Sequence, residues 1–425
     1  MSTPLSAAHR SWRTKIFVAT WLSYVGFYFC RKPFSAAKKA IGQDYDWSAW
    51  TLSKIWFAYL IAYAIGQFLA SQMGPRLGPR KNVLLGMALS IVVTLAMGVT
   101  PSVWILAGLV AVNGLAQATG WSGNVGTMAG WFHKHERGRV MGLWSTNFTI
   151  GALASGWVMS GVLGVASWQW CFYTGAIVLA VVWVQFYVLQ RDRPEDVGLA
   201  PVDDPATEID ESKLAAPAPT ADLGLSRDAW INLLLVAGFY FFAKFIRYAV
   251  WSWAAYFLGK NYGMSDSEAN FYAPVFDLAG LPGIYLTGWI SDRWFGSRRG
   301  EIALIMMFGM IVATALLVVF ASAGVAVFVV LLGAVGFTLF GPDALLTGAG
   351  AIDIGSRRAA TFAAATISGF GSIGAAVQEI VIGQLYDPDK QGLGLIFALL
   401  LGSAVMGTLF CAALVLRNRR GGKGI

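Results

Sequence analysis

The sequence predicts an all-α polytopic membrane protein with twelve transmembrane helices in two pseudo-symmetric bundles of six. Three observations predict this fold class. Of the 425 residues, 56% are hydrophobic and only 13% are charged, about half the charged fraction of a typical soluble protein. Apolar runs recur along the chain, most of them near the ~20 residues that a helix needs to cross a bilayer. One polar segment divides the runs into two equal sets.

The apolar runs are expected to form helices over residues 16–36, 50–72, 82–100, 103–131, 140–164, 168–190, 229–258, 269–291, 301–321, 325–353, 359–384 and 394–416. The segment 191–228 is rich in Asp, Glu, Pro and Ala and has no apolar stripe, so we expect a flexible linker there. The predicted domains are an N-terminal bundle over 1–190, this linker, and a C-terminal bundle over 229–425.

Positive charges predict the orientation of the chain, because cytoplasmic loops retain Lys and Arg. Clusters of these residues precede the first run and follow the second, fourth, eighth, tenth and twelfth. The opposite loops are expected to hold only Lys38, Lys39, Lys260 and Lys390. We therefore expect a multi-pass protein of the inner or plasma membrane with both termini in the cytoplasm.

The remaining composition argues against other classes of protein. The excess of eight positive charges lies in short loops and forms no clustered basic face for nucleic acid. The three cysteines fall inside apolar runs, and the three histidines have no metal-ligand spacing. No nucleophile constellation or phosphate-binding loop is present. We expect no enzyme activity, no metal and no cofactor.

Cations inside two apolar runs are the strongest functional signal. Arg31 and Lys32 lie late in the first run, and Lys244 and Arg247 lie within the seventh. An arginine at a helix centre costs about 2.5–3.5 kcal/mol on insertion scales, and such residues usually mark a substrate path. The preceding Gly26–Phe29 recurs as Gly238–Phe241, which indicates that the halves are copies. Repeats of this kind place a substrate site at their interface near the bilayer midplane.

At these residues the sequence resembles the major facilitator superfamily and, within it, the organophosphate:phosphate antiporters, over nearly the whole chain. Gly288–Arg293 matches the loop motif of the superfamily. The more specific motifs are Arg31-Lys-Pro33, Asn113–Trp121, Gly130-Trp-Phe132, Pro194–Gly198, Phe242-Ala-Lys244, Val275-Phe-Asp277, Gly341-Pro342 and Gly371–Ala376.

The resemblance implies an antiporter that exchanges a sugar phosphate or glycerol phosphate for inorganic phosphate by alternating access. It also implies that Arg31 and Arg247 hold the phosphate, and that Asp292 with Arg293 latches a cytoplasmic helix end. Two positions depart from the glycerol-phosphate carriers. Gln67 stands where they have a lysine, and Phe148 where they have a histidine.

The candidate site residues fall into two sets. Those expected to bind substrate are Arg31, Arg247, Lys244, Lys32, Gln67, Tyr28, Asn147 and Asp277; those expected to gate or couple transport are Asp292, Arg293, Asp343 and Glu379. Structural alternatives stay open for three of them: Arg31 snorkelling to the helix end, a Lys244–Asp277 salt bridge without substrate contact, and Asp343 as a helix-break cap. For Glu379 the functional role considered is that of a proton or substrate-hydroxyl partner.

Charge favours obligate exchange. A phosphate ester carries about −1.5 to −2 charge near pH 7, which two arginine forks match well. Without a bound anion, the uncompensated cations are expected to oppose closure of the substrate cavity. Two rival functions remain: a transporter-like sugar-phosphate sensor that signals through a partner kinase, and a proton-coupled organic-anion symporter in which Asp277, Asp343 or Glu379 titrates. The expected partners are phosphate compounds and the lipid bilayer, and the protein is expected to be a monomer.

Overall fold

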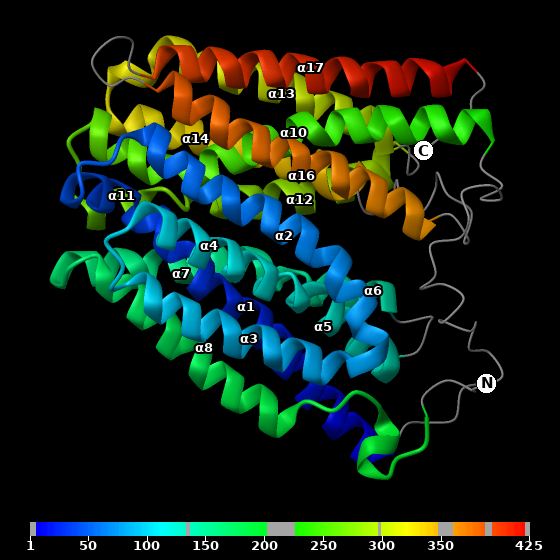
Figure 1. Cartoon of the computed structure of the whole chain (residues 1–425). Helices are drawn as coiled ribbons and strands as arrows, with labels where there is room; N and C mark the ends of the chain where they lie inside the picture. The colour runs from blue at the N-terminus through cyan, green and yellow to red at the C-terminus, as the bar shows by residue number, and fades with distance from the viewer. Residues whose placement is uncertain are drawn as a thin grey trace. The chain divides into compact units, whose positions relative to one another are not determined.

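The computed structural model describes residues 6–132, 137–201, 226–295, 299–346, 360–386 and 393–420. Within these ranges it leaves out the side chains of residues 68, 70–76, 129, 137–139, 142, 292 and 360–365. The described residues form α-helices joined by short turns, and no strand occurs among them (Figure 1). The predicted all-α fold class is confirmed.

The helices before the predicted linker are α1 (Ala7–Asp44), α2 (Ala49–Leu77), α3 (Pro79–Met97), α4 (Val103–Gln117), α5 (Thr119–Trp131), α6 (Arg137–Trp144), α7 (Thr146–Val165) and α8 (Gln169–Leu189), followed by the 3-10 turn η1 (Pro194–Val197). Those after it are α10 (Arg227–Asn261), α11 (Asp266–Tyr272), α12 (Val275–Trp294), α13 (Arg299–Phe320), η4 (Ala321–Ala323), α14 (Val325–Ala344), α16 (Ala360–Leu385) and α17 (Gly394–Arg419).

The predicted apolar runs coincide with these helices. Nine segments of the described chain are long and apolar enough to cross a membrane: α3, α4 with most of α5, α7, α8, α10, α13 with η4, α14, most of α16, and α17. The other three predicted runs coincide with α1, α2 and α12. Residues 347–353 of the tenth run, residue 359 of the eleventh, and residues 202–225 of the linker lie outside the described residues.

Two predicted runs are each interrupted by a single residue, Ala118 between α4 and α5 and Ser145 between α6 and α7. A threonine follows each break. The Thr119 hydroxyl donates to the carbonyl of Ala116 and the Thr146 hydroxyl to that of Leu143, both at 2.8 Å. Such bonds compete with the backbone ladder and bend helices, which explains interruptions that hydropathy alone does not predict.

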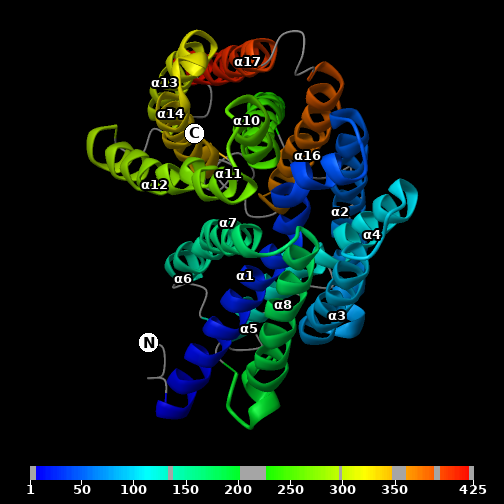
Figure 2. The same cartoon turned by 90° about the vertical axis from the view of Figure 1, so that its left-hand side faces the viewer.

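The chain divides into two compact units. Unit 1 comprises Met1–Ala37 and Ala58–Ala218, and unit 2 comprises Lys38–Phe57 and Pro219–Ile425. In unit 1, α3 packs against α4, α5 and α8. In unit 2, α10 packs against α16 and α17, and α12 against α14, as Figure 2 shows. The end of α1 and the start of α2 therefore group with the C-terminal helices.

Glycines allow equivalent close contacts in the two units. A Cβ atom at Gly175 would lie 2.0 Å from the carbonyl oxygen of Phe29, and one at Gly374 would lie 2.1 Å from that of Phe241. Only glycine permits helices to approach this closely. Because Phe29 and Phe241 end the repeated Gly-Phe-Tyr-Phe sequence, the packing agrees with the internal repeat.

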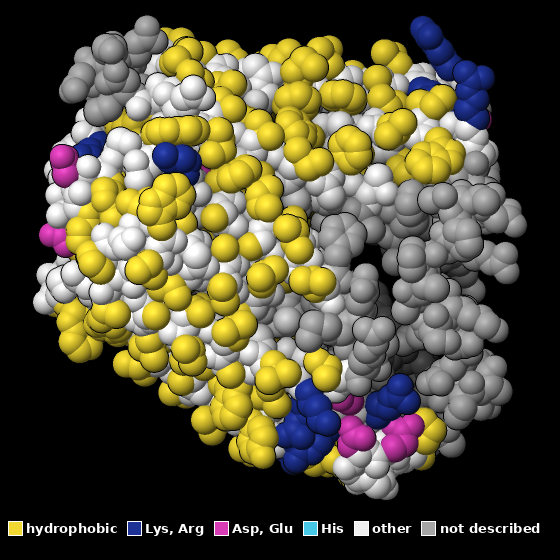
Figure 3. All heavy atoms as spheres, viewed as in Figure 1, with side chains coloured by type: hydrophobic (Ala, Val, Ile, Leu, Met, Phe, Trp, Pro, Cys, Tyr) yellow, Lys and Arg dark blue, Asp and Glu magenta, His cyan; other side chains and the backbone are white. Residues whose placement is uncertain are grey.

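The helix surfaces are suited to lipid. Hydrophobic side chains are spread over the described helices in Figure 3, whereas Lys and Arg gather at helix ends such as that of α17. Trp104, Val165 and Tyr285 are at least 72% exposed. A water-facing surface rarely exposes so many large apolar side chains, so we treat the chain as spanning a membrane.

The short helix α11 begins outside the spanning segments with a capping box. The Ser265 hydroxyl accepts from the backbone N–H of Glu268, while the Glu268 carboxylate accepts from the Ser265 hydroxyl at 2.7 Å and from its N–H at 3.0 Å. These bonds lower the pKa of Glu268 below its usual value. They satisfy backbone donors that a helix start leaves open.

Candidate functional site

Arg31 lies in the middle of α1 and is 8% exposed. Its Nε donates to Oε1 of Gln117 on α4 at 2.9 Å. This acceptor is a neutral amide, so the bond orients the guanidinium without neutralising it. The Nη2 atom has no hydrogen-bond partner among the described residues. Arg31 is therefore a buried cation with donor capacity to spare.

A polar network from four helices, α1 to α4, fixes Gln117. Its Oε1 also accepts from the Tyr59 hydroxyl at 3.1 Å, and its Nε2 lies 3.2 Å from Oδ1 of Asn113. Asn113 accepts from the Ser90 hydroxyl at 2.6 Å and donates to the carbonyl of Cys30 on α1. Sequence reasoning missed Gln117 and Ser90 as site residues. The available signal was the spacing of Asn113 and Gln117, two amides one turn apart in an apolar run.

Tyrosine rings surround the Arg31 guanidinium. Its carbon lies 4.8 Å from the ring centre of Tyr28, 5.1 Å from that of Tyr63 and 5.9 Å from that of Tyr59. Aromatic faces stabilise a cation without supplying a counter-charge. The candidate Tyr28 thus lies beside Arg31, whereas sequence reasoning missed Tyr59 and Tyr63.

The other candidates of unit 1 are buried or half-buried. Lys32 is 4% exposed, Gln67 on α2 is half-buried, and Asn147 on α7 is fully buried. Neither amide atom of Asn147 has a hydrogen-bond partner in the part of the chain that the structure describes. A buried amide with this unused capacity is costly unless a ligand or water satisfies it.

A second cationic cluster lies in unit 2. Nη1 of Arg247 on α10 is 2.8 Å from Oδ2 of Asp343 on α14, and the guanidinium lies 4.6 Å from the ring centre of Phe340. The Arg247 side chain is 20% exposed and that of Asp343 only 8%. Asp343 is thus an ion-pair partner of a cation predicted to bind substrate, which sequence reasoning did not foresee.

Lys244 precedes Arg247 by three residues on α10. Its ammonium lies 5.1 Å from the ring centre of Tyr240 and 5.7 Å from that of Tyr248. Among the described residues Lys244 forms no ion pair, so the considered salt bridge to Asp277 is not observed. Asp277 is buried in the first turn of α12.

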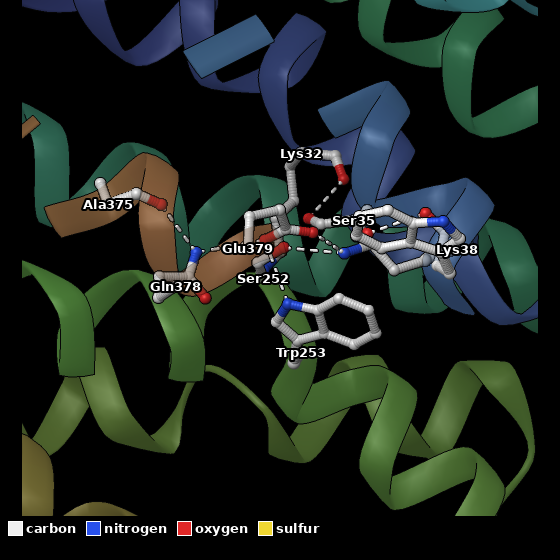
Figure 4. Close-up of polar contacts among 10 residues, drawn as sticks. Lys32, Ser35, Lys38, Ser252, Trp253, Ala375, Gln378 and Glu379 are labelled. Atoms are coloured by element: carbon white, nitrogen blue, oxygen red, sulfur yellow. Dashed lines mark hydrogen bonds and ion pairs between the residues drawn. The ribbon is translucent and has the colours of Figure 1, made fainter. Parts of the chain in front are cut away.

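Glu379 occupies a different cluster, also in unit 2 (Figure 4). Its carboxylate pairs with the Lys38 ammonium at 2.7 Å and accepts from Trp253 Nε1 at 3.0 Å and Gln378 Nε2 at 3.2 Å. Lys38 also donates to the Ser252 hydroxyl at 2.9 Å and lies 3.8 Å from the Trp253 ring centre. Both charged side chains are 0% exposed.

The expectation that Lys38 is a loop cation is wrong. Helix α1 continues to Asp44, eight residues beyond the predicted end of the first run, and Lys38 lies inside it. The predicted run stops before Lys38 because hydropathy counts the charge of the lysine. It cannot detect the Glu379 carboxylate, 341 residues away in sequence, which compensates that charge.

The predicted latch residues are only partly described. The side chain of Asp292 lies outside the described residues. Arg293, near the end of α12, is exposed, and its guanidinium lies 5.7 Å from the Trp289 ring centre. The other two gating candidates each form an ion pair through their carboxylate, Asp343 with Arg247 and Glu379 with Lys38.

Each unit therefore holds cations suited to anion binding. No group of three or more His, Cys, Asp or Glu able to hold a metal occurs among the described residues. Arginine forks beside aromatic rings, such as Arg31 and Arg247, can bind the oxygens of a phosphate or carboxylate. Among the described residues, the hydrogen-bond acceptor of Arg31 is the neutral Gln117, whereas Arg247 forms an ion pair with the Asp343 carboxylate.

Comparison with known proteins agrees with this chemistry. The family model of the Major Facilitator Superfamily matches residues 16–378. The glycerol-3-phosphate transporter of Bacillus subtilis is 29% identical over 96% of this chain and 93% of its own. The glucose-6-phosphate exchanger SLC37A2 of Mus musculus is 27% identical over 96% and 93%. These relatives confirm the resemblance to organophosphate transporters.

Solved structures share the fold. The crystal structure of a bacterial homologue of the human lysosomal transporter Spinster, in an inward-facing and occupied conformation, superposes with a TM-score of 0.70. It covers 98% of both chains at 16% identity.

Proposed function

We propose, since the chain belongs to the Major Facilitator Superfamily, that it carries an organic phosphate ester and exchanges it for inorganic phosphate by alternating access. Members of this family are membrane transporters and not enzymes. The substrates named for its relatives, glycerol 3-phosphate and glucose 6-phosphate, support a phosphorylated polyol or sugar as the organic substrate.

The observation that carries the proposal is the state of Arg31. Its guanidinium is buried, oriented by the neutral Gln117, and retains an Nη2 group without a partner among the described residues. A phosphate group offers three acceptor oxygens and about −1.5 to −2 charge. It therefore supplies what Arg31 lacks among the described residues, a negatively charged acceptor.

The charge balance of the membrane helices supports exchange. Among the candidate substrate-binding residues, Arg31 and Lys32 give unit 1 two positive charges, whereas in unit 2 the charges of Lys244 and Arg247 are balanced by those of Asp277 and Asp343. The two positive charges of unit 1 match one phosphate dianion. Lys38 and Glu379 neutralise each other. Because uncompensated buried charge is costly, we expect the transporter to change conformation with an anion bound and not without one.

We further propose that the chain lies in the inner or plasma membrane, as a monomer with both termini in the cytoplasm. Arg417, Arg419 and Arg420 end α17, and basic residues also precede the first predicted span. Cytoplasmic ends retain such residues. Protease digestion of spheroplasts bearing a C-terminal tag tests the orientation, which would be refuted by removal of the tag from outside.

Transport is tested by uptake of labelled phosphate into proteoliposomes preloaded with phosphate, glucose 6-phosphate, glycerol 3-phosphate or buffer alone. We expect uptake only into vesicles that contain a phosphate compound. Equal uptake into empty vesicles driven by a proton gradient would replace exchange with symport. Binding without any uptake would favour the transporter-like sensor.

The network behind Arg31 gives a second expected result. Gln117→Glu keeps the shape of the side chain but places a carboxylate beside Arg31. The new charge competes with phosphate for the same guanidinium, so we expect the Kd for phosphate to rise about tenfold or more. Isothermal titration at pH 8 measures the change. The matched variant Gln185→Glu changes an amide of α8 outside the network, and unchanged affinity in both variants would exclude this role for Gln117.

A further inference from the structure

The Arg247–Asp343 ion pair has a consequence for substrate selection. The two side chains come from α10 and α14, and their charged atoms are 2.8 Å apart. Asp343 directly follows Pro342 inside α14. By contrast, Arg31 is held by the amide of Gln117. One of the two arginines thus already has a carboxylate acceptor, and the other has a neutral one.

A carboxylate and a phosphate group are alternative acceptors for one guanidinium. Both form short charge-assisted bonds with the same N–H donors. If both stay bound, two anions lie within a few ångström in a low dielectric, where like charges repel strongly. A phosphate that contacts Arg247 must therefore displace Asp343 or tolerate it as a repulsive neighbour.

We propose that Asp343 is an internal anion that competes with substrate for Arg247 and makes the transporter selective for doubly charged phosphate esters. This inference rests on the proposed function. A singly charged anion that replaces Asp343 at Arg247 exchanges one negative charge for another, so its binding gains little electrostatic free energy. A phosphate dianion carries one more negative charge than Asp343, so its attraction to Arg247 exceeds that of the carboxylate that it displaces.

Lys244 supplies the environment that this exchange requires. It lies on α10 three residues before Arg247, on the same helix face, and both Arg247 and Asp343 lie close enough to act on its charge. It forms no ion pair of its own among the described residues. When Asp343 leaves Arg247, Lys244 is the neighbouring cation that keeps its carboxylate from being buried without a counter-charge.

The same competition affects turnover. Asp343 restores the ion pair when phosphate leaves, so it favours release as well as opposing binding. Its removal is expected to lower KM and kcat together. A residue that merely stabilises the fold would not produce this combined change.

The test compares Asp343→Asn with the wild type. Binding of glucose 6-phosphate and of its singly charged analogue glucose 6-sulfate is measured by isothermal titration at pH 8, and phosphate exchange is measured in proteoliposomes. For Asp343→Asn we expect glucose 6-sulfate to bind about tenfold more tightly relative to glucose 6-phosphate, with lower KM and kcat. Asp343→Glu should keep the wild-type ratio.

Glu301→Gln is the matched control, because it breaks another arginine–carboxylate pair of unit 2, that of Glu301 with Arg419 at 3.2 Å. Its ratio should not change. If Asp343→Asn does not fold, Asp343→Ser removes the same charge and carries the test. An unchanged sulfate-to-phosphate ratio in the charge-removed variant refutes the inference. Failure of the wild type to bind any phosphate compound refutes the proposed function instead.

Discussion

Replacing Arg31 with lysine is expected to lower phosphate exchange roughly a hundredfold while the protein still folds. Lysine keeps the charge but presents a compact ammonium in place of the planar fork. It cannot hold Gln117 through one nitrogen and leave others for phosphate, as the Arg31 Nε and Nη2 atoms do. The loss of one charge-assisted hydrogen bond, at about 1.5–3 kcal/mol, accounts for the expected effect.

Initial rates of phosphate counterflow and the Kd for phosphate measure this effect. Arg227→Lys is the matched control, because Arg227 is exposed at the start of α10, and its rates should equal those of the wild type. A thermal unfolding midpoint close to that of the wild type shows that Arg31→Lys is folded. Wild-type KM and turnover in Arg31→Lys would show that the guanidinium does not contact the phosphate.

The helices and the main cations were predictable from sequence for a simple physical reason. A bilayer requires ~20 apolar residues for each span, and a cation within such a run is conspicuous. Arg31 and Arg247 were found in this way, and both lie in a helix beside aromatic rings. Whether they bind phosphate stays a prediction.

What could not be predicted depends on contacts between distant parts of the sequence. The partner of Arg247 is 96 residues away and that of Lys38 is 341 residues away. Hydropathy treats Lys38 as a loop residue because it counts the charge and not the carboxylate that compensates it. The same holds for Gln117, whose role depends on which neighbour its amide faces.

Breaking the Lys38–Glu379 pair from one side is expected to be the most destabilising single change that these residues allow. Glu379→Gln leaves the Lys38 ammonium fully buried beside a neutral amide, and Lys38→Met leaves the Glu379 carboxylate without its cation. Removing one partner of a buried ion pair typically costs about 3–5 kcal/mol. We expect each variant to lower the apparent unfolding midpoint in detergent markedly.

The double variant Lys38→Met with Glu379→Gln is expected to be more stable than the sum of the two single changes predicts. It leaves no charge at either position, and the amide oxygen introduced by Glu379→Gln can still accept from Trp253, which in the wild type donates to Glu379 at 3.0 Å. The pair Arg419–Glu301, in which the Arg419 side chain is 64% exposed and the Glu301 side chain 14%, provides the matched cycle, with an expected coupling of at most about 1 kcal/mol. Additive losses in the Lys38–Glu379 cycle would contradict this expectation, because they would mean that each charge is stabilised by its other neighbours. For Lys38 these are Ser252 and the Trp253 ring, and for Glu379 they are Trp253 Nε1 and Gln378.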